Sequence, residues 1–217
     1  LFRSHEIPDV YFISNRILAL YDRQIVFQGT PEEMEDFDHP FMDEVINSLE
    51  SLQKELTGLH SRRQFKVLNH VQMKRGAAGN YSIVVFSLRD RDDIIAKLGH
   101  DAASEILRNM GLRINRHFGM IGGFSTRRNT NEFITMIPYS NLAEASSILQ
   151  DFGQDLNSQV IRPMGPGACK LSSGESMDVT IIAGIAEGRA ESDIDSVITQ
   201  ARSQKKEIGR LRCAAGE

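Results

Sequence analysis

The sequence has no tryptophan, only two cysteines, and no apolar stretch that approaches the roughly 20 residues needed to span a bilayer. Cys169 and Cys213 are far apart and belong to no Cys-x-x-Cys spacing, so we expect reduced thiols in a cytosolic protein. The first residues do not show the pattern of a signal peptide, so we expect none. The net charge of -4 lacks the basic surplus that nucleic-acid binding requires. These absences argue against membrane-spanning, disulfide-stabilised and nucleic-acid-binding proteins.

What is present is the composition of an ordinary globular protein, with 41% hydrophobic and 25% charged residues. The 217 residues suffice for one large domain, or for a medium domain plus a small one. Near the start, two short apolar runs at 17–20 and 24–27 are joined by polar residues, which predicts a β-hairpin. Thr30 is placed as the cap of a following helix, with Glu33 three residues later.

A longer helix is predicted over residues 40–57, because apolar residues recur there at spacings of three and four. We interpret it as a connector that packs on its own domain, with a dimer seam as the alternative, since it covers too few heptads for a coiled coil. Its apolar stripe consists of Phe41, Val45, Leu49, Leu52 and Leu56.

The rest of the chain alternates predicted strands and helices, which places it in an α/β or α+β class. Gly, Pro and Ser are dense over residues 162–174, where a loop is expected. Strands are expected at 81–88, 132–137 and 179–186, and helices from about Asp92, over 101–117, over 141–154 with Asn141 as cap, and from Ser192 to about Ile208.

Five motifs in this region, in order over about 160 residues, resemble the GGDEF (diguanylate cyclase) family. Leu56–Phe65 is similar to the family's L-T-G-L-x-N-R-R-x-F, and Gly99-His100 to its G-H pair. Arg128–Phe133 stands where R-G-G-D-E-F belongs, Val179–Ala186 resembles V-T-x-S-x-G-I-A, and Ala201–Arg210 resembles A-L-Y-x-A-K-x-x-G-R. The resemblance implies an α+β fold with a central, mostly antiparallel sheet flanked by helices, as in the palm of nucleotide cyclases.

In working members of that family, two domains that each hold GTP join the nucleotides into cyclic di-GMP. This chemistry needs Mg²⁺ at the triphosphate, and Mg²⁺ needs carboxylate ligands. The family's first metal-binding Asp aligns with Ser87, and the second Asp of that motif with Arg89. Its guanine-binding Asn aligns with Ile95, and a second guanine contact with Ser104.

The signature turn has diverged as well. Its two glycines, which let the backbone approach phosphate, are Asn129 and Thr130, and its acidic metal ligand is Asn131. Glu132 and Phe133 are retained. We therefore expect a vestigial signature that holds no metal, and a degenerate domain that is not an enzyme.

The inhibitory R-x-x-D of the family is also missing, with Met120 and Gly123 in its place. Two residues, Lys206 and Arg210, match the family's basic phosphate contacts and are the candidates for binding a phosphate or another anion. A simpler interpretation makes them cations at a helix C-terminus, and makes Glu132 an exposed turn acid. Three hypotheses follow: a regulatory or protein-interaction domain, a nucleotide or anion sensor, and a cyclase with unusual ligands.

The first residues resemble the tail of an ABC transporter ATPase, of the lipid or organic-solvent transport type. Ser4-His5-Glu6 is similar to that family's S-H-D, which would make His5 the switch histidine. Arg23–Glu33 resembles G-x-I-x-x-x-G-T-P-E-E, with Arg23 in place of the first glycine. The chain contains no G-x-x-x-x-G-K-[ST], so ATP hydrolysis by these residues alone is not expected.

The expected organisation is an ABC ATPase fragment at 1–39, the connector at 40–57, the degenerate GGDEF domain at 58–213 and a tail at 214–217. We expect no cofactor for this chain, and ATP with Mg²⁺ only in a longer parent protein that continues upstream of Leu1. The expected partners are another protein or a second copy, and an ABC permease through the parent ATPase. The expected location is the cytoplasm, at the inner face of the membrane.

Overall fold

The computed structural model describes most of the chain from residue 16 onward. Residues 1–15, most of 31–58, and 61, 76–78, 130, 159, 163–170, 173–174 and 215–217 lie outside the description. His5, most of the predicted 40–57 helix and Cys169 fall in these segments. Of that helix, residues 41–42 and 45–46 are described, and they are helical.

The N-terminal hairpin consists of β1 (Ile17–Tyr21) and β2 (Gln24–Gly29), paired antiparallel. Ile17 and Phe27 of the hairpin form a small apolar cluster with residues that follow it in the chain, Met34, Met42 and Ile46. The predicted helix start is present as a reciprocal cap. The Thr30 amide donates to Glu33 Oε2 at 2.8 Å, and the Glu33 amide donates to Thr30 Oγ1 at 3.2 Å.

The main domain is built on a six-stranded sheet in the order β4-β5-β3-β7-β8-β6. All neighbouring strands are antiparallel except β6 and β8, which are parallel. The strands are β3 (Asn80–Leu88), β4 (Phe124–Asn129), β5 (Glu132–Pro138), β6 (Val160–Ile161), β7 (Ser176–Arg189) and β8 (Lys206–Ala214).

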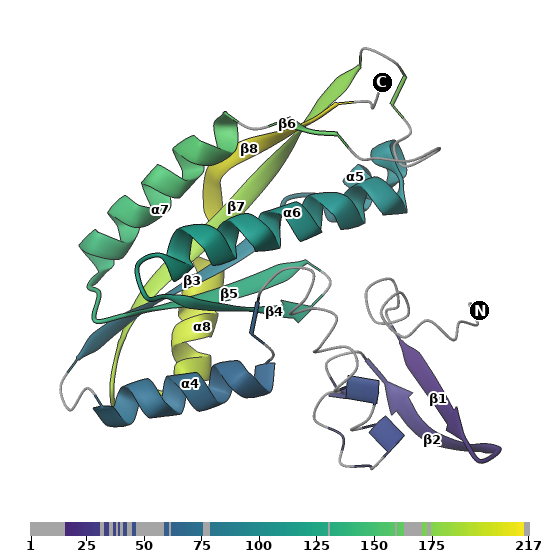
Figure 1. Ribbon diagram of the computed structural model, residues 1–217, viewed down its shortest axis with the longest axis horizontal. Helices are drawn as coiled ribbons and strands as arrows, with labels where there is room; N and C mark the ends of the chain where they lie inside the picture. The colour runs from purple at the N-terminus through teal and green to yellow at the C-terminus, as the bar shows by residue number, and fades with distance from the viewer. Residues whose placement is uncertain are drawn as a thin grey trace.

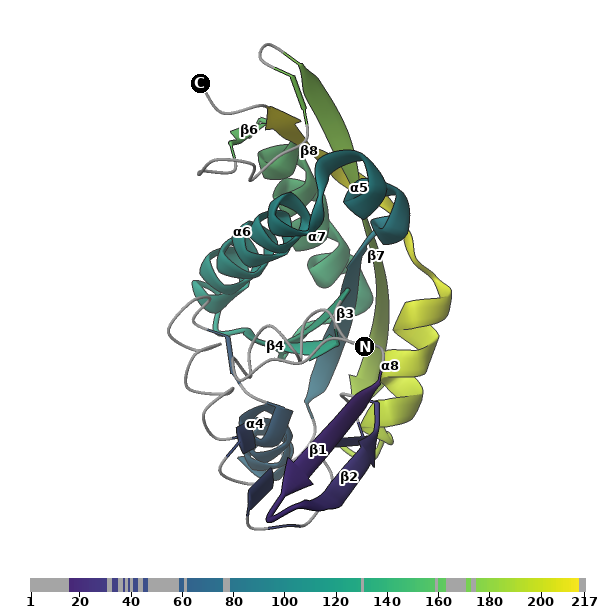
Figure 2. The ribbon, with the colours of Figure 1, turned by 90° about the vertical axis from the view of Figure 1, so that its right-hand side faces the viewer.

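Helices cover both faces of this sheet, as Figures 1 and 2 show. α6 and α7 pack on one face, and α4 and α8 on the other. α5 leads from the end of β3 into α6. No described helix is long and apolar enough to cross a membrane. The helices are α4 (Arg62–Arg75), α5 (Arg91–Leu98), α6 (His100–Gly119), α7 (Leu142–Asn157) and α8 (Ile194–Ser203).

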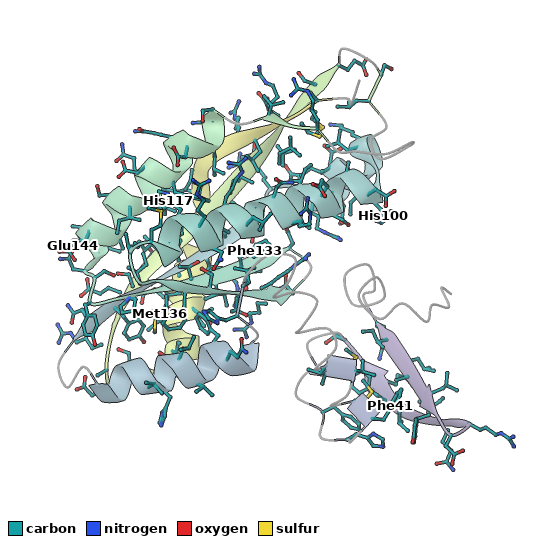
Figure 3. All side chains as sticks on the ribbon, viewed as in Figure 1. Phe41, His100, His117, Phe133, Met136 and Glu144 are labelled. Carbon is teal, nitrogen blue, oxygen red and sulfur yellow. The ribbon has the colours of Figure 1, made fainter. Side chains whose placement is uncertain are left out.

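The central strand β3 is buried on both faces of the sheet. Ile83 and Val85 belong to the core under α4 and α8, whereas Val84 and Phe86 belong to the core under α6 and α7. A strand covered on both faces is continuously apolar, which is why residues 81–88 were recognisable in the sequence. Figure 3 labels Phe133 and Met136 on β5, which belong to the two separate cores in the same way.

The expected α+β fold with a central sheet flanked by helices is confirmed, but two local expectations were wrong. The last helix was expected to run to about Ile208, whereas α8 ends at Ser203 and a strand, β8, follows from Lys206. Lys206 and Arg210 therefore do not belong to a helix C-terminus. Glu132 is no exposed turn acid either, because it is 5% exposed.

Candidate functional site

The candidate site lies at the end of the sheet where the central strand β3 finishes, beside the β4–β5 turn and the start of α5. Ser87 on β3 lies opposite Glu132 on β5 in the register of the two strands. Both side chains leave the sheet on the face that carries α8, because Val85 and Ile134, two residues away, belong to that core. The first replaced metal position and the retained signature acid are thus neighbours.

Glu132 is held by two cations, Arg202 in the last turn of α8 and Lys205 in the turn that follows it. Arg202 donates from Nε to Oε2 at 3.0 Å and from Nη2 to Oε1 at 2.7 Å. Lys205 donates from Nζ to Oε2 at 2.9 Å. Burial alone would raise the pKa of Glu132, but the hydrogen bonds and charges of Arg202 and Lys205 outweigh it and lower that pKa. The carboxylate is therefore ionised and fully engaged by the protein.

Lys205 also links the first replaced metal position, Ser87, to the retained signature acid, Glu132. Its Nζ lies 2.6 Å from Ser87 Oγ, so one ammonium contacts both Ser87 and Glu132. The Lys205 side chain is only 14% exposed. To reach Ser87 it extends past β7, which lies between β8 and β3 in the sheet.

A glycine on β7 allows this close approach. A Cβ at Gly184 would collide with the carbonyl oxygen of Ala201 and would lie 2.8 Å from the backbone nitrogen of Lys205. Any side chain at this position would therefore push the α8–β8 corner away from the sheet. The glycine brings the backbone of Lys205 close enough for its side chain to enter the site.

Asn131 stands at the acidic metal position of the signature, and both polar ends of its side chain form hydrogen bonds with the backbone of β3. Its Oδ1 accepts from the Leu88 amide at 3.0 Å, and its Nδ2 donates to the Leu88 carbonyl at 3.0 Å. The backbone N–H of Asn131 donates to Asn129 Oδ1 at 2.9 Å. The carboxamide donates and accepts at once, whereas the ionised carboxylate of a metal-binding Asp could only accept. Thr130 lies outside the described residues.

Arg89 and Arg210 share one carboxylate. Glu207 Oε2 lies 3.1 Å from Arg89 Nη1, and Glu207 Oε1 lies 2.8 Å from Arg210 Nε. The hydrogen bond from Arg210, together with the two positive charges, lowers the pKa of Glu207. Lys206 is exposed at the start of β8 and forms no ion pair within the described part of the chain.

The positions expected to contact guanine offer little to a base. Ile95 on α5 is partly buried and packs against the core under α6 and α7, and Ser104 is exposed on α6. An open depression lies between the start of α5 and the signature turn. Three carboxylates and one guanidinium line it, so its charge opposes a triphosphate. The lining residues are Asp90, Arg91, Asp92, Asp93 and Asn131.

These residues do not fit the Mg²⁺ that the family chemistry uses. Mg²⁺ requires hard oxygen ligands, usually with carboxylates among them. Here Ser87 is a hydroxyl, Asn131 is committed to Leu88, and Glu132 already faces two positive groups. At an effective dielectric constant of about 20, a divalent ion about 4 Å from an ammonium would be repelled by on the order of 8 kcal/mol.

The sequence of residues 52–210 matches the family described as diguanylate cyclase, GGDEF domain. The chain belongs to the GGDEF family. This match spans most of the chain, and it includes the strands and helices that form the candidate site. No curated protein matches the chain.

Solved structures of GGDEF domains share the fold. The GGDEF domain of DgcB from Caulobacter crescentus, in complex with c-di-GMP, is 16% identical, with a TM-score of 0.56 over 68% of this chain and 84% of that one. The FimX GGDEF domain from Pseudomonas aeruginosa is 16% identical, with a TM-score of 0.56 over 69% and 88%. The active GGEEF domain of a diguanylate cyclase from Vibrio cholerae is 16% identical, with a TM-score of 0.53 over 72% and 97%.

In this GGDEF domain, the fold gathers only some of the residues singled out in the sequence. Ser87 and Glu132 meet, and Asn131 lies beside them. Lys206 is not among the groups that bind Ser87 or Glu132; its neighbour Lys205 is. The sequence offered no signal to prefer Lys205, because the family motif places its lysine at position 206.

Proposed function

We propose that this GGDEF-family domain does not make cyclic di-GMP and acts as a regulatory or protein-interaction domain. The observation that carries the proposal is the commitment of Asn131. At the position where a metal-binding acid is needed, the side chain is a neutral amide, and both of its polar groups form hydrogen bonds with the Leu88 backbone. Ser87, the other metal position, is a hydroxyl in contact with an ammonium.

The surroundings of the expected nucleotide support the same conclusion. Ile95 leaves the polar edge of guanine without a partner, and each unmatched buried polar group costs about 1–3 kcal/mol. The depression at the start of α5 is lined by Asp90, Asp92 and Asp93, which repel phosphates in the absence of a metal. The reaction requires both the metal ligands and the guanine contacts, and this domain has lost both.

Calorimetric titration of the purified chain tests this proposal. GTP, ATP and cyclic di-GMP are each added with Mg²⁺ and again with EDTA. We expect no heat of binding for any ligand under either condition. Binding of GTP that requires Mg²⁺ would contradict the proposal and would favour a cyclase with unusual ligands.

A second function, a nucleotide or anion sensor, is supported by one observation. Lys206 and Arg210 are exposed on β8, with Arg210 only partly neutralised because it shares Glu207 with Arg89. In the same titration, binding that persists in EDTA would favour this function. Lys206→Ala combined with Arg210→Ala should then eliminate the signal, and an unchanged affinity would exclude these residues.

We also propose that the domain is attached to the ATP-binding subunit of an ABC transporter at the inner face of the membrane. The support is the resemblance of residues 1–39 to the tail of such ATPases, with His5 as the candidate switch histidine. The regulated partner would then be the ATPase or, through it, the permease. The gene sequence upstream of Leu1 tests this attachment: a G-x-x-x-x-G-K-[ST] is expected there, and a different domain would refute it.

A further inference from the structure

We propose that the ammonium of Lys205 takes the place of the divalent ion, so that this GGDEF domain carries its own cation. This inference rests on the proposed loss of catalysis and adds a cause to it. Missing carboxylates alone would leave a weak site that a metal could still enter at high concentration. A built-in positive charge at the same place opposes the entry of a metal ion by direct repulsion.

The contacts of Lys205 are those expected of a substitute cation. Its Nζ lies 2.6 Å from Ser87 Oγ and 2.9 Å from Glu132 Oε2, on two adjacent strands. These are the first metal position and the retained acid of the signature. The ammonium is mostly buried, so its charge is less screened by water than that of a surface lysine.

The charges around Glu132 do not favour a third cation beside Arg202 and Lys205. One carboxylate faces the guanidinium of Arg202 and the ammonium of Lys205, so these three groups together carry a net positive charge. Both oxygens of Glu132 already accept hydrogen bonds from these cations. A metal ion could bind Glu132 only by displacing Lys205.

The backbone supports this role as well as the side chains. Lys205 lies in the short turn between α8 and β8, and Gly184 on β7 lets this turn lie against the sheet. The position of Lys205 therefore follows from the packing of the α8–β8 turn against β7.

Mn²⁺ binding to matched variants tests the inference. Ser87→Asp restores one carboxylate opposite Glu132, and it is compared with Ser87→Asp combined with Lys205→Met. Asn131 is left unchanged, so that its bonds to Leu88 survive. Mn²⁺ is titrated alone and followed by electron paramagnetic resonance, and circular dichroism establishes that each variant is folded. The charge-matched control combines Ser87→Asp with Lys206→Met, which removes an exposed lysine one residue along the chain.

The expected result is that Ser87→Asp binds Mn²⁺ no better than the unaltered chain, because the introduced carboxylate pairs with Lys205. Adding Lys205→Met should tighten Mn²⁺ binding at least tenfold, whereas adding Lys206→Met should not. Equal binding by Ser87→Asp with and without Lys205 would overturn the inference. A folded variant with both Ser87→Asp and Lys205→Met that ignores Mn²⁺ would overturn it too. Both of these results concern metal binding by variants, and neither shows whether the unaltered chain is catalytic. The proposed function is therefore tested separately, by the titration of the unaltered chain.

Discussion

Replacing Glu132 by Gln should destabilise the domain strongly, because Arg202 and Lys205 would lose the carboxylate that both of them bind. Removing one partner of a buried ion pair costs about 3–5 kcal/mol. The Arg202 side chain is 40% exposed and can return to water, whereas Lys205 is 14% exposed and cannot do so easily. We therefore expect a loss of about 2–4 kcal/mol, which for a chain of this size lowers Tm by about 5–15 °C.

Urea unfolding at pH 7 measures this loss, and Lys205→Met provides the companion variant. With Lys205 also removed, the buried ammonium without a partner is gone, so the double variant should be more stable than the sum of the single effects predicts, by about 1–3 kcal/mol. A Glu132→Gln variant within about 0.5 kcal/mol of the unaltered chain would refute the ion-pair reasoning. Strict additivity would show that Glu132 and Lys205 do not interact.

The stability of the unaltered chain and that of Glu132→Gln should depend differently on pH. The pKa of Glu132 is lowered in the folded state from its ordinary value of 4.5, so on acidification the unfolded chain binds this proton first. The stability that Glu132 contributes is therefore fully present above about pH 4.5 and is lost as the pH falls through the folded-state pKa. Glu132→Gln should lack this loss, and parallel acid-unfolding curves for the two proteins would contradict the assignment.

Three further substitutions test local contacts, two of them at the site and one at the cap of α7. Asn131→Asp removes the donor to the Leu88 carbonyl and should cost about 1–3 kcal/mol in urea unfolding, without any gain in Mg²⁺ binding. Gly184→Ala places a Cβ against the Ala201 carbonyl and should cost about 3 kcal/mol, measured as a fall in Tm. Asn141→Ala removes the Oδ1 that accepts from the Glu144 backbone N–H in the capping box of α7, and it should cost about 1 kcal/mol in urea unfolding.

Gly119→Ala is the matched control for Gly184→Ala, because a Cβ at Gly119 meets nothing within 4 Å. It should leave the stability within about 0.5 kcal/mol. If Gly184→Ala is as mild as this control, the α8–β8 corner is not fixed by backbone contact. An Asn131→Asp variant of unchanged stability would show that the Leu88 bonds are dispensable, and an unchanged Asn141→Ala variant would do the same for the cap.

Features encoded by neighbouring residues could be predicted from the sequence. The reciprocal caps at Thr30 and Asn141 depend on residues three positions away, and both are present. The run 81–88 is apolar on both faces, which identified the central strand. By contrast, β4 (Phe124–Asn129) is largely polar and lies at the sheet edge, so its sequence carries no strong strand pattern.

The β8 strand was missed although a period of two is present in its sequence. Gly209, Leu211 and Cys213 are buried, and Arg210 and Arg212 between them are exposed. The apolar spacing of the preceding helix runs on through Ile208 and hid this change of period.

The role of Lys205 could not have been predicted from local pattern. Positions 205 and 206 are both lysine, and nothing in their neighbours distinguishes the buried one from the exposed one. The difference arises because the α8–β8 turn rests on Gly184, some twenty residues earlier in the chain. The contact with Ser87 then spans more than a hundred residues of sequence.

Incubation of the purified chain with GTP and Mg²⁺, followed by mass spectrometry of the nucleotides, tests the central claim most directly. An active diguanylate cyclase in parallel establishes that the assay detects product. The expected result is GTP recovered intact, with no cyclic di-GMP above the level of a reaction containing EDTA. Cyclic di-GMP that forms in proportion to the protein concentration, and only with Mg²⁺, would contradict the claim.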